Sequence, residues 1–251
     1  MIDLSSLNEN QREAVLWDKG PLLVLAGPGS GKTRVLTSRI ARILEQSAGQ
    51  YFRILALTFT NKAAAEMRGR VEELVPRELG RIRLTTFHSY AAELLQQHGN
   101  HLSFRPDFQI LSNDSDREAL LDDVLGQIRK GLTYSLPDHF TAAQLLPAIT
   151  RLLEQCVPPD QAEGLLQQAN VENAMPLARV YAAYREALRR TNSLDFPSLI
   201  AESLDLLSKF PFLIKHVRKV YKHILVDEFQ DTNHTQYQIL SLIARPILPR
   251  C

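Results

Sequence analysis

Short apolar runs alternate with helical segments near both ends of the chain. Four runs are candidates for buried strands, and each leads into a segment whose apolar residues recur at helical spacing. The runs are PLLVLA (21–26), RILALTF (53–59), RIRLTTF (81–87) and KHILVDE (222–228). Asn61 is placed to cap the helix that follows the second run. A repeated strand-then-helix unit predicts an α/β fold, with a parallel sheet covered by helices on both faces.

The pattern changes between His98 and about Asn192, where the apolar spacing is helical throughout. We expect amphipathic helices over 115–130, 141–156, 159–169 and 176–191, the first behind a cap at Ser112 or Asn113. Prolines 137, 147, 158, 159 and 176 are expected to separate these helices. The prediction is therefore one α/β domain formed by residues 1–91 and 194–251, with an all-helical subdomain, residues 92–193, inserted into it.

Composition limits the classes of function. The chain has 251 residues, is 45% hydrophobic and 23% charged, and carries a formal net charge of +1, which is typical of a globular protein and gives no global attraction to nucleic acid. A nucleic-acid surface would have to be a local groove. The chain contains no apolar run long enough to span a membrane and no secretory signal, and Cys156 and Cys251 match no metal-ligand spacing, so a reduced, cytoplasmic protein without a membrane partner is expected.

The segment AGPGSGKT (26–33) fits the relaxed form of a phosphate-binding loop, with Ala26 where the strict form has glycine. Glycines allow the backbone N–H groups to turn toward phosphate oxygens, and the following helix directs its positive end at the same anion. Lys32 would add positive charge at the outer phosphates and Thr33 would offer a hydroxyl to Mg²⁺. A plain glycine-rich turn is the alternative. The expected nucleotide contacts are Ala26, Gly27, Pro28, Gly29, Ser30, Gly31, Lys32 and Thr33.

The apolar run ILVDE ends in two carboxylates that could complete a nucleotide site. Asp227 would hold Mg²⁺ and Glu228 would orient and deprotonate an attacking water. Taken alone, the pair is better explained as an exposed acidic strand end. Together with the phosphate loop, it favours hydrolysis over binding alone.

Several motifs occur in the order found in one family. The segments AGPGSGKTR (26–34), LTFTNKAAAEMRGR (57–70), TTFHSY (85–90) and DEFQDTN (227–233) make the chain resemble the UvrD/Rep/PcrA family of superfamily 1 DNA helicases. LNENQREAV, at the start, resembles the family's glutamine motif, and LDFPSLI (194–200) resembles the return to the first motor domain. The resemblance covers residues 7 to about 244 and implies a RecA-like P-loop NTPase fold, flanked by helices and carrying an inserted helical subdomain.

The resemblance also implies roles for individual residues in the nucleotide site. Gln11 would read the adenine, which implies ATP, and Arg34 would pack against the base. Gln230 would sense the γ-phosphate beside the catalytic Lys32 and Glu228, or link that phosphate to DNA, whereas Asp231 would shape the loop. Without the family match, Arg34 would be read as a surface helix arginine.

The resemblance further implies that single-stranded DNA crosses the strand ends without sequence preference. The expected contacts are Phe59, Thr60, Asn61, Thr86, Phe87 and His88. An aromatic ring can stack on a base, and small polar groups can bond phosphates. Without the family match, Phe59 and Phe87 would be read as core residues, and His88 as an ordinary polar residue.

After LSLIA the chain reads RPILPRC, and two prolines in seven residues do not favour a buried strand. The family continues into a coupling motif and a second motor domain, so the sequence predicts a truncated first motor domain of a 3′-to-5′ helicase. Such a chain would bind ATP–Mg²⁺ weakly and turn it over slowly or not at all unless a protein partner or the second domain completes the site. Two alternatives stay open: a non-catalytic nucleotide- or DNA-binding module, and a fragment of a RecB-like helicase–nuclease subunit. The oligomeric state is not indicated.

Overall fold

The structure is a computed structural model that describes residues 4–131 and 136–244. The chain divides into two compact units. The sheet unit comprises Met1–Tyr90, Phe210–Thr232 and Leu240–Cys251, and the helical unit comprises Ala91–Lys209 and Asn233–Ile239. The predicted features at RPILPRC, including Cys251, lie outside the described residues.

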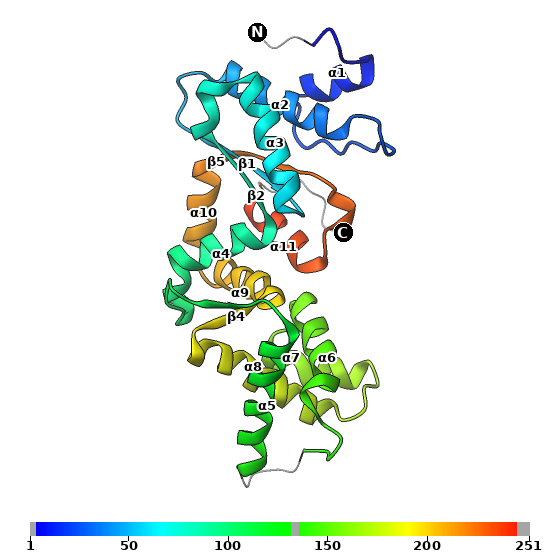
Figure 1. The fold of residues 1–251 in the computed structure, drawn as a ribbon, viewed down its shortest axis with the longest axis vertical. Coiled ribbons are helices and arrows are strands. Elements are labelled where there is room, and N and C mark those ends of the chain that lie inside the picture. The colour runs from blue at the N-terminus through cyan, green and yellow to red at the C-terminus, as the bar shows by residue number, and fades with distance from the viewer. Residues whose placement is uncertain (1–3, 132–135, 245–251) are drawn as a thin grey trace. The chain divides into compact units, whose positions relative to one another are not determined.

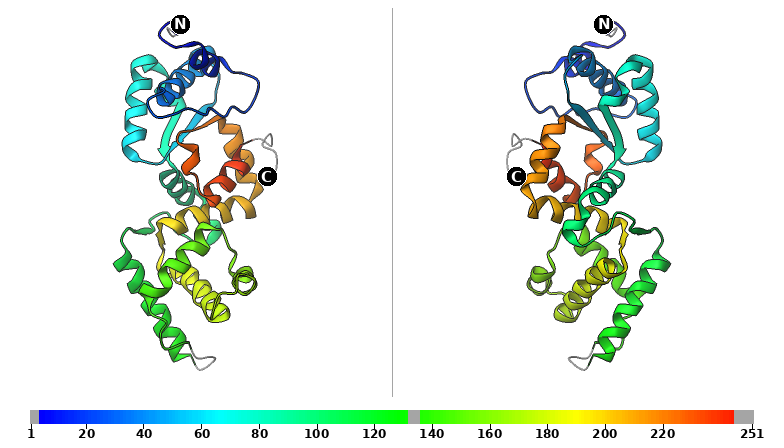
Figure 2. Two further views of the ribbon diagram at one scale, coloured as in Figure 1. Left: turned by 90° about the vertical axis from the view of Figure 1, so that its right-hand side faces the viewer. Right: turned by 90° about the vertical axis from the view of Figure 1, so that its left-hand side faces the viewer.

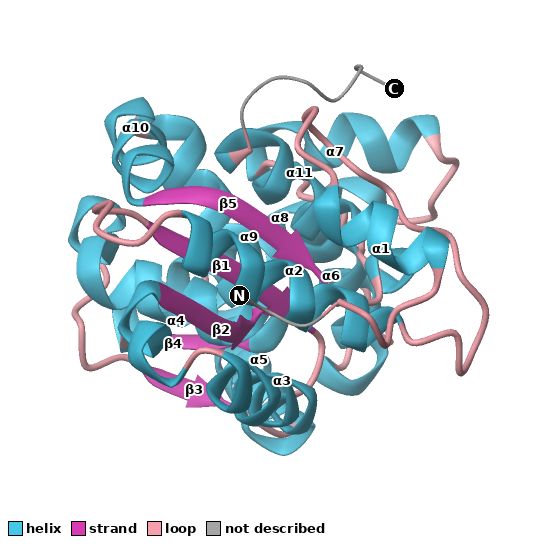
Figure 3. Ribbon diagram, turned by 90° about the horizontal axis from the view of Figure 1, so that it is seen from above, coloured by secondary structure: helices cyan, strands magenta, loops and turns pink. Residues whose placement is uncertain are grey.

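A three-stranded parallel sheet, in the order β2-β1-β5, forms the centre of the sheet unit (Figure 3). Its strands are β1 (Arg53–Thr58), β2 (Ile82–Thr86) and β5 (Tyr221–Val226). The register places Thr58 opposite Thr86 and Leu57 opposite Val226, so the carboxyl ends of all three strands lie together. Three of the four predicted strands are thus confirmed, as is the parallel sheet flanked by helices.

Helices pack against this sheet through apolar side chains. Besides the first turn of α4 (Phe87–His98), the helices with residues in the sheet unit are α1 (Glu9–Leu16), α2 (Lys32–Gln46), α3 (Asn61–Leu74), α10 (Pro211–Val220) and part of α11 (His234–Ile243). The ribbons of α2 and α3 lie beside the strands of the sheet (Figure 2). Ile40 and Leu44 of α2 and Met67 of α3 form one core cluster with Ile54 of β1 and Leu84 of β2. The 3₁₀ turns η1 (Pro76–Arg81) and η3 (Phe229–Asp231) precede β2 and follow β5. No helix in the described part of the chain is long and apolar enough to cross a membrane.

The fourth predicted strand, PLLVLA, is wrong in this structure. Residues 21–26 run between α1 and α2 without regular secondary structure (Figure 1). The apolar side chains there are exposed, Leu23 by 65% and Leu25 by 86%. A strand needs a neighbouring strand to take its backbone hydrogen bonds. None pairs with this segment, and β5 is left as an edge of the sheet.

The caps of two helices test the predicted helix starts. Thr60, and not Asn61, caps α3, because the Thr60 Oγ1 accepts a hydrogen bond from the backbone N–H of Ala63 at 3.0 Å. Asn61 is the first residue inside the helix. In the helical unit Asn113, one of two predicted candidates, caps the following helix by accepting from the Asp116 N–H at 2.8 Å.

The helical unit has one large apolar core. Its elements are α4 (Phe87–His98, which begins in the sheet unit), η2 (Gly99–Leu102), β3 (Gln109–Leu111), α5 (Asp114–Lys130), α6 (Ala142–Glu154), α7 (Pro159–Gln168), α8 (Ala174–Thr191), β4 (Ser193–Asp195) and α9 (Phe196–Lys209). The four predicted helices are present. Pro147 lies inside α6, however, and does not end it. The buried row Leu145, Leu146, Ile149, Leu152 and Leu153 offsets the one backbone hydrogen bond that the proline removes.

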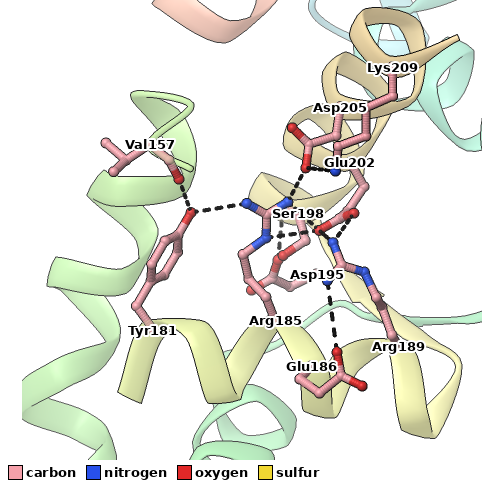
Figure 4. Close-up of polar contacts among 10 residues, drawn as sticks. All are labelled: Val157, Tyr181, Arg185, Glu186, Arg189, Asp195, Ser198, Glu202, Asp205 and Lys209. Carbon is pink, nitrogen blue, oxygen red and sulfur yellow. Dashed lines mark hydrogen bonds and ion pairs between the residues drawn. The ribbon is translucent and has the colours of Figure 1, made fainter. Parts of the chain in front are cut away.

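Two features of the helical unit differ from the expectation. Strands β3 and β4 form a short parallel pair, although neither segment is an apolar run that predicted a strand. The sequence predicts that the chain returns to the α/β domain at residue 194, which would place α9 in that domain. In the structure α9 belongs to the helical unit, which extends to Lys209. Buried ion pairs hold it there: Arg185 of α8 bonds Glu202 of α9 at 2.6 Å, and Arg189 bonds the same carboxylate at 2.7 Å (Figure 4).

Candidate nucleotide and nucleic-acid site

The phosphate loop forms a tight turn that ends at the start of α2. Gly29 and Gly31 have φ angles of +73° and +86°, in the left-handed region that favours glycine. The Ser30 N–H and hydroxyl both donate to the Gly27 carbonyl, at 3.3 and 2.7 Å. Gly31 is the N-cap of α2 and provides no side-chain hydrogen bond. The first amide groups of α2 therefore have no side-chain acceptor, which suits them to an anion.

The Lys32 side chain folds back across this turn. Its Nζ donates to the carbonyls of Ala26 and Gly27, at 3.3 and 3.4 Å. An ammonium group bonded to neutral carbonyls keeps its full positive charge. The loop thus holds a cation over a set of backbone donors, which is the arrangement that a polyphosphate requires.

The acidic end of β5 lies close to this cation. The Asp227 N–H donates to the Leu57 carbonyl at 2.9 Å, which fixes Asp227 at the end of the sheet with only 9% of its surface exposed. Burial raises the pKa of Asp227 and the Glu228 carboxylate raises it further, whereas a hydrogen bond from the Glu228 backbone and the Lys32 charge lower it. The Lys32 charge thus acts on Asp227 from a distance, without a direct hydrogen bond or ion pair between the two side chains. That both residues serve one nucleotide site stays a prediction.

Glu228 and Gln230 are joined to each other. Glu228 has a φ of +50°, which is uncommon for a residue with a side chain and turns the chain sharply after Asp227. The Gln230 amide donates to the Glu228 carboxylate. In this structure, then, Gln230 orients Glu228. A contact of Gln230 with a phosphate stays a prediction.

Gln11 ties α1 to the phosphate loop. Its Nε2 donates to the Ser30 carbonyl at 2.8 Å, and its Oε1 accepts from the Asn8 N–H at 3.1 Å. Asn8 in turn accepts from the Gln11 N–H, which completes a capping box at the start of α1. A Cβ at position 31 would lie 2.9 Å from the Gln11 amide, so glycine is also required there for close approach. Each polar atom of the amide keeps capacity for one further hydrogen bond, so adenine recognition stays a prediction.

Arginines of α2 anchor the neighbouring segment, a feature that the sequence reasoning missed. The Arg39 guanidinium donates to the carbonyls of Ala14, Val15 and Trp17 at the end of α1, and Arg42 also donates to Val15. These bonds satisfy carbonyls that a helix end leaves without partners. Arg34, for which a contact with the base was predicted, donates to the Ser6 hydroxyl in this structure. No sequence pattern identified these bonds, because they join residues more than twenty positions apart.

The predicted nucleic-acid contacts lie at the ends of β1 and β2. Thr60 and Asn61 are exposed, and Phe59 and His88 are half-buried. Phe87 is 3% exposed, and its ring packs against that of Phe59 with the centroids 5.5 Å apart. The Phe59 ring is therefore partly accessible to a base. The Phe87 ring is buried against Phe59 and has no solvent-exposed surface on which a base could stack.

Two further members of this group have structural partners. The buried Thr86 hydroxyl donates to the Ser89 hydroxyl at 2.9 Å and accepts from the Ser89 N–H at 3.1 Å, so it stabilises the first turn of α4. Burial lowers the pKa of His88, which makes its ring neutral at neutral pH. That these residues bind DNA stays a prediction.

Comparison with known proteins matches nearly the whole chain to the family that its ordered motifs resemble. The UvrD/REP helicase N-terminal domain family matches residues 7–247. The chain is 36% identical to the ATP-dependent DNA helicase PcrA of Staphylococcus epidermidis over 248 residues, which are 99% of this chain and 33% of the relative. It is 38% identical to the ATP-dependent DNA helicase UvrD1 of Mycobacterium tuberculosis over 238 residues, 94% of this chain and 30% of the relative.

The match is to one part of these relatives, since the chain spans about a third of their length. The helical residues 92–193, the loop at 26–33 and the acidic end of β5 all lie within the matched region. The resemblance inferred from the ordered motifs is thereby confirmed, and the chain belongs to the UvrD/REP helicase family, in the region of its N-terminal domain.

Proposed function

We propose that this chain is the ATP- and Mg²⁺-binding first motor domain of an ATP-dependent DNA helicase that contacts single-stranded DNA. The observation that carries the proposal is that Asp227 is fixed at the carboxyl end of one parallel sheet, where burial raises its pKa and the Lys32 charge of the phosphate loop lowers it. In open α/β sheets, ligands bind at this edge. The relatives are ATP-dependent DNA helicases, which supports the same interpretation.

The residues fit a nucleoside triphosphate. Left-handed glycines at 29 and 31 and the uncapped start of α2 leave amide donors for phosphate oxygens. Lys32 is held within reach by neutral carbonyls, which it can leave for a phosphate at little cost. Gln11 is fixed by its capping box beside the loop and retains hydrogen-bonding capacity for the base.

The residues also fit a magnesium ion bound together with a nucleotide. In the described part of the chain no group of three or more His, Cys, Asp or Glu residues could hold a metal by itself. Thr33 and Asp227 alone would give two oxygen ligands, and Mg²⁺ commonly combines one or two protein ligands with waters and substrate phosphates. Bound there, the ion would neutralise charge on the phosphates.

Glu228 is the group placed to accept a proton. Its backbone adopts the left-handed conformation directly after Asp227, and Gln230 holds the carboxylate by donating to it. Asp227 can then serve the metal while Glu228 orients and deprotonates a water. At the neighbouring strand ends, Phe59 would stack on a base, while Thr60, Asn61 and His88 would bond phosphates without reading sequence.

Titration of the chain with Mg²⁺-ATP tests the nucleotide site. Lys32→Ala removes the cation from the loop, so we expect affinity to fall by 100-fold or more, on the order of the 3 kcal/mol typical of a lost charged contact. The matched control is Lys130→Ala, an exposed lysine at the end of α5, which should bind like the unmodified chain. Equal affinity of the two variants would refute the site.

Turnover tests the role of Glu228. We expect Glu228→Gln to bind Mg²⁺-ATP normally and to lose any hydrolysis, whether or not single-stranded DNA is added, because an amide cannot accept the proton. Hydrolysis by this variant at the original rate would remove Glu228 from the mechanism. If the unmodified chain binds nucleotide but never hydrolyses it, even with DNA and a second motor domain supplied in trans, the non-catalytic alternative is correct.

A further inference from the structure

A second feature of the sheet unit is a stretch of one-sided charge. Between Leu206 and Val226 the sequence contains no Asp or Glu, whereas the whole chain has a net charge of +1. Within the sheet unit's part of this stretch, residues 210–226, the cations are Lys215, Arg218, Lys219 and Lys222. This stretch therefore carries a local excess of positive charge, on α10 (Pro211–Val220) and at the start of β5 (Tyr221–Val226).

The helix α10 separates this charge from its apolar side. Leu213 and Val217 are buried. Lys215 and Lys219, four residues apart, are exposed on the same face, and Lys222 is exposed on β5. No ion pair joins these three lysines to any residue that the structure describes. Arg218 differs, because its guanidinium donates to the carbonyls of Leu242 and Ala244, so it caps α11.

An aromatic side chain extends the lysine row. Phe212 lies about one turn before Lys215 and two turns before Lys219. It is 53% exposed and packs edge-on against Phe210, with the ring centroids 6.2 Å apart. Phe210 therefore holds the Phe212 ring in place while much of the ring faces solvent. An aromatic ring followed by cations at helical spacing is what a nucleic-acid strand requires, because the ring can stack on a base and the cations can follow the phosphates.

The row is separate from the candidate site. α10 leads into the amino end of β5 (Figure 3), and the catalytic carboxylates follow the carboxyl end of that strand. A strand of six residues spans about 20 Å. The nucleotides of a single-stranded DNA that contact Phe59 and His88 would therefore not be the ones that contact Lys222.

We propose that Phe212, Lys215, Lys219 and Lys222 form a second, sequence-independent contact for single-stranded nucleic acid, on α10 and the amino end of β5. The phosphates bind the three lysines and one base stacks on Phe212. An acidic protein would complement the lysines as well, but it gains nothing from an exposed aromatic ring in the same row. The proposal extends the proposed function, because it takes DNA as the ligand.

The salt dependence of single-stranded DNA binding tests the lysines. Each phosphate contact adds about 0.7 to the slope of log affinity against log salt, so Lys215→Gln/Lys219→Gln/Lys222→Gln should lower that slope by about 2. When the salt concentration rises fourfold, the unmodified chain should therefore lose roughly 20-fold more affinity for single-stranded DNA than the triple lysine variant loses. The matched control is Lys19→Gln/Arg77→Gln/Lys130→Gln, which removes the same charge from exposed positions elsewhere and should leave the slope close to that of the unmodified chain.

Phe212→Leu tests the ring while preserving apolar contact with Phe210. We expect affinity for single-stranded DNA to fall roughly tenfold at constant salt slope, because stacking is lost and no charge is changed. A duplex of the same length should be insensitive to this change. Identical unfolding curves of all variants would show that they are folded.

Several outcomes would overturn the inference: an unchanged slope in the lysine variant, an equal loss in the control, or polyglutamate competing as well as single-stranded DNA. The last result would assign the surface to an acidic protein. Nucleotide titration distinguishes this failure from failure of the proposed function. If Mg²⁺-ATP binds normally but the slope is unchanged, only the second contact is wrong. If Mg²⁺-ATP does not bind and the slope still falls, the second contact stands without the motor.

Discussion

Buried and half-buried charges have opposite surroundings in the two units of this chain. In the helical unit the side chains of Arg185 and Glu202, 3% and 1% exposed, bond each other, and Arg189 and Asp205 complete the group (Figure 4). In the sheet unit Lys32 bonds only neutral carbonyls, and Asp227 lies beside another carboxylate, Glu228. One set of charges is neutralised within the protein and the other is not.

Helix starts do not follow the division between the units. Side chains cap α3, α5 and α6, through Thr60, Asn113 and Thr141, whereas α2, α7, α8 and α10 have no side-chain cap, and of these α2 is the one that begins in the phosphate loop. Uncompensated donors and charges cost stability in a free chain, and a ligand of complementary charge removes that cost. The difference teaches which polar groups hold the fold and which await a ligand, and it can be tested by substitution.

The largest effect on stability is expected in the helical unit. Glu202→Ala leaves the buried Arg185 guanidinium with only its contacts to Asp205 and the Tyr181 hydroxyl. We expect a loss of about 3–5 kcal/mol in the free energy of unfolding, as for other buried pairs that lose one partner. Denaturant unfolding measures the loss, and Mg²⁺-ATP affinity should be unchanged in variants that fold.

Glu186→Ala is the matched control, because it removes a carboxylate that is 75% exposed and 4.0 Å from the same Arg189. Its effect should be within about 0.5 kcal/mol. The double variant Arg185→Met/Glu202→Leu removes both charges and should recover most of the loss. If Glu202→Ala and Glu186→Ala destabilise equally, the buried network does not hold α9 on the helical unit.

A smaller effect is expected at a helix cap. Asn113→Ala removes the acceptor for the Asp116 N–H at the start of α5, which should cost about 1 kcal/mol in the free energy of unfolding. Ser112→Ala, next to it, should cost almost nothing, because Ser112 was the other candidate cap and does not serve as one. Equal losses in the two variants would contradict the capping assignment.

The elements that the sequence predicts well share a local cause. Helices with caps and apolar faces, such as α5 and α6, depend on neighbours in sequence, and the phosphate loop depends on adjacent glycines. The failures depend on partners distant in sequence. Residues 21–26 are apolar enough for a strand but have no strand beside them, and the β3–β4 pair joins residues about eighty positions apart. Arginine bonds from Arg39 to α1, and from Arg185 to α9, have no sequence spacing that announces them.

The motifs predicted which residues form the site but not how each is held. The motifs predict that Lys32 and Asp227 serve one site, yet Lys32 bonds backbone carbonyls and acts on Asp227 only through its charge. Phe87 has an aromatic side chain at the right position, yet only the packing shows that Phe59 covers it. Exposure is a property of the assembled sheet, so a motif alone could not separate these two rings.

The smallest effect is expected at Asp227, and its sign distinguishes the two units most directly. Burial and Glu228 raise the pKa of Asp227 above its ordinary value. Between the ordinary and the raised pKa the folded chain binds more protons than the unfolded chain, so the stability that Asp227 contributes falls as the pH rises through this window. Asp227→Asn should therefore raise the thermal midpoint of the nucleotide-free chain at neutral pH, while losing the stabilisation that Mg²⁺-ATP gives. Asp123→Asn, on an exposed position of α5, should change neither quantity. A lower midpoint for Asp227→Asn would mean that this carboxylate stabilises the fold as Glu202 does, and the contrast between the two units would then fail at its central residue.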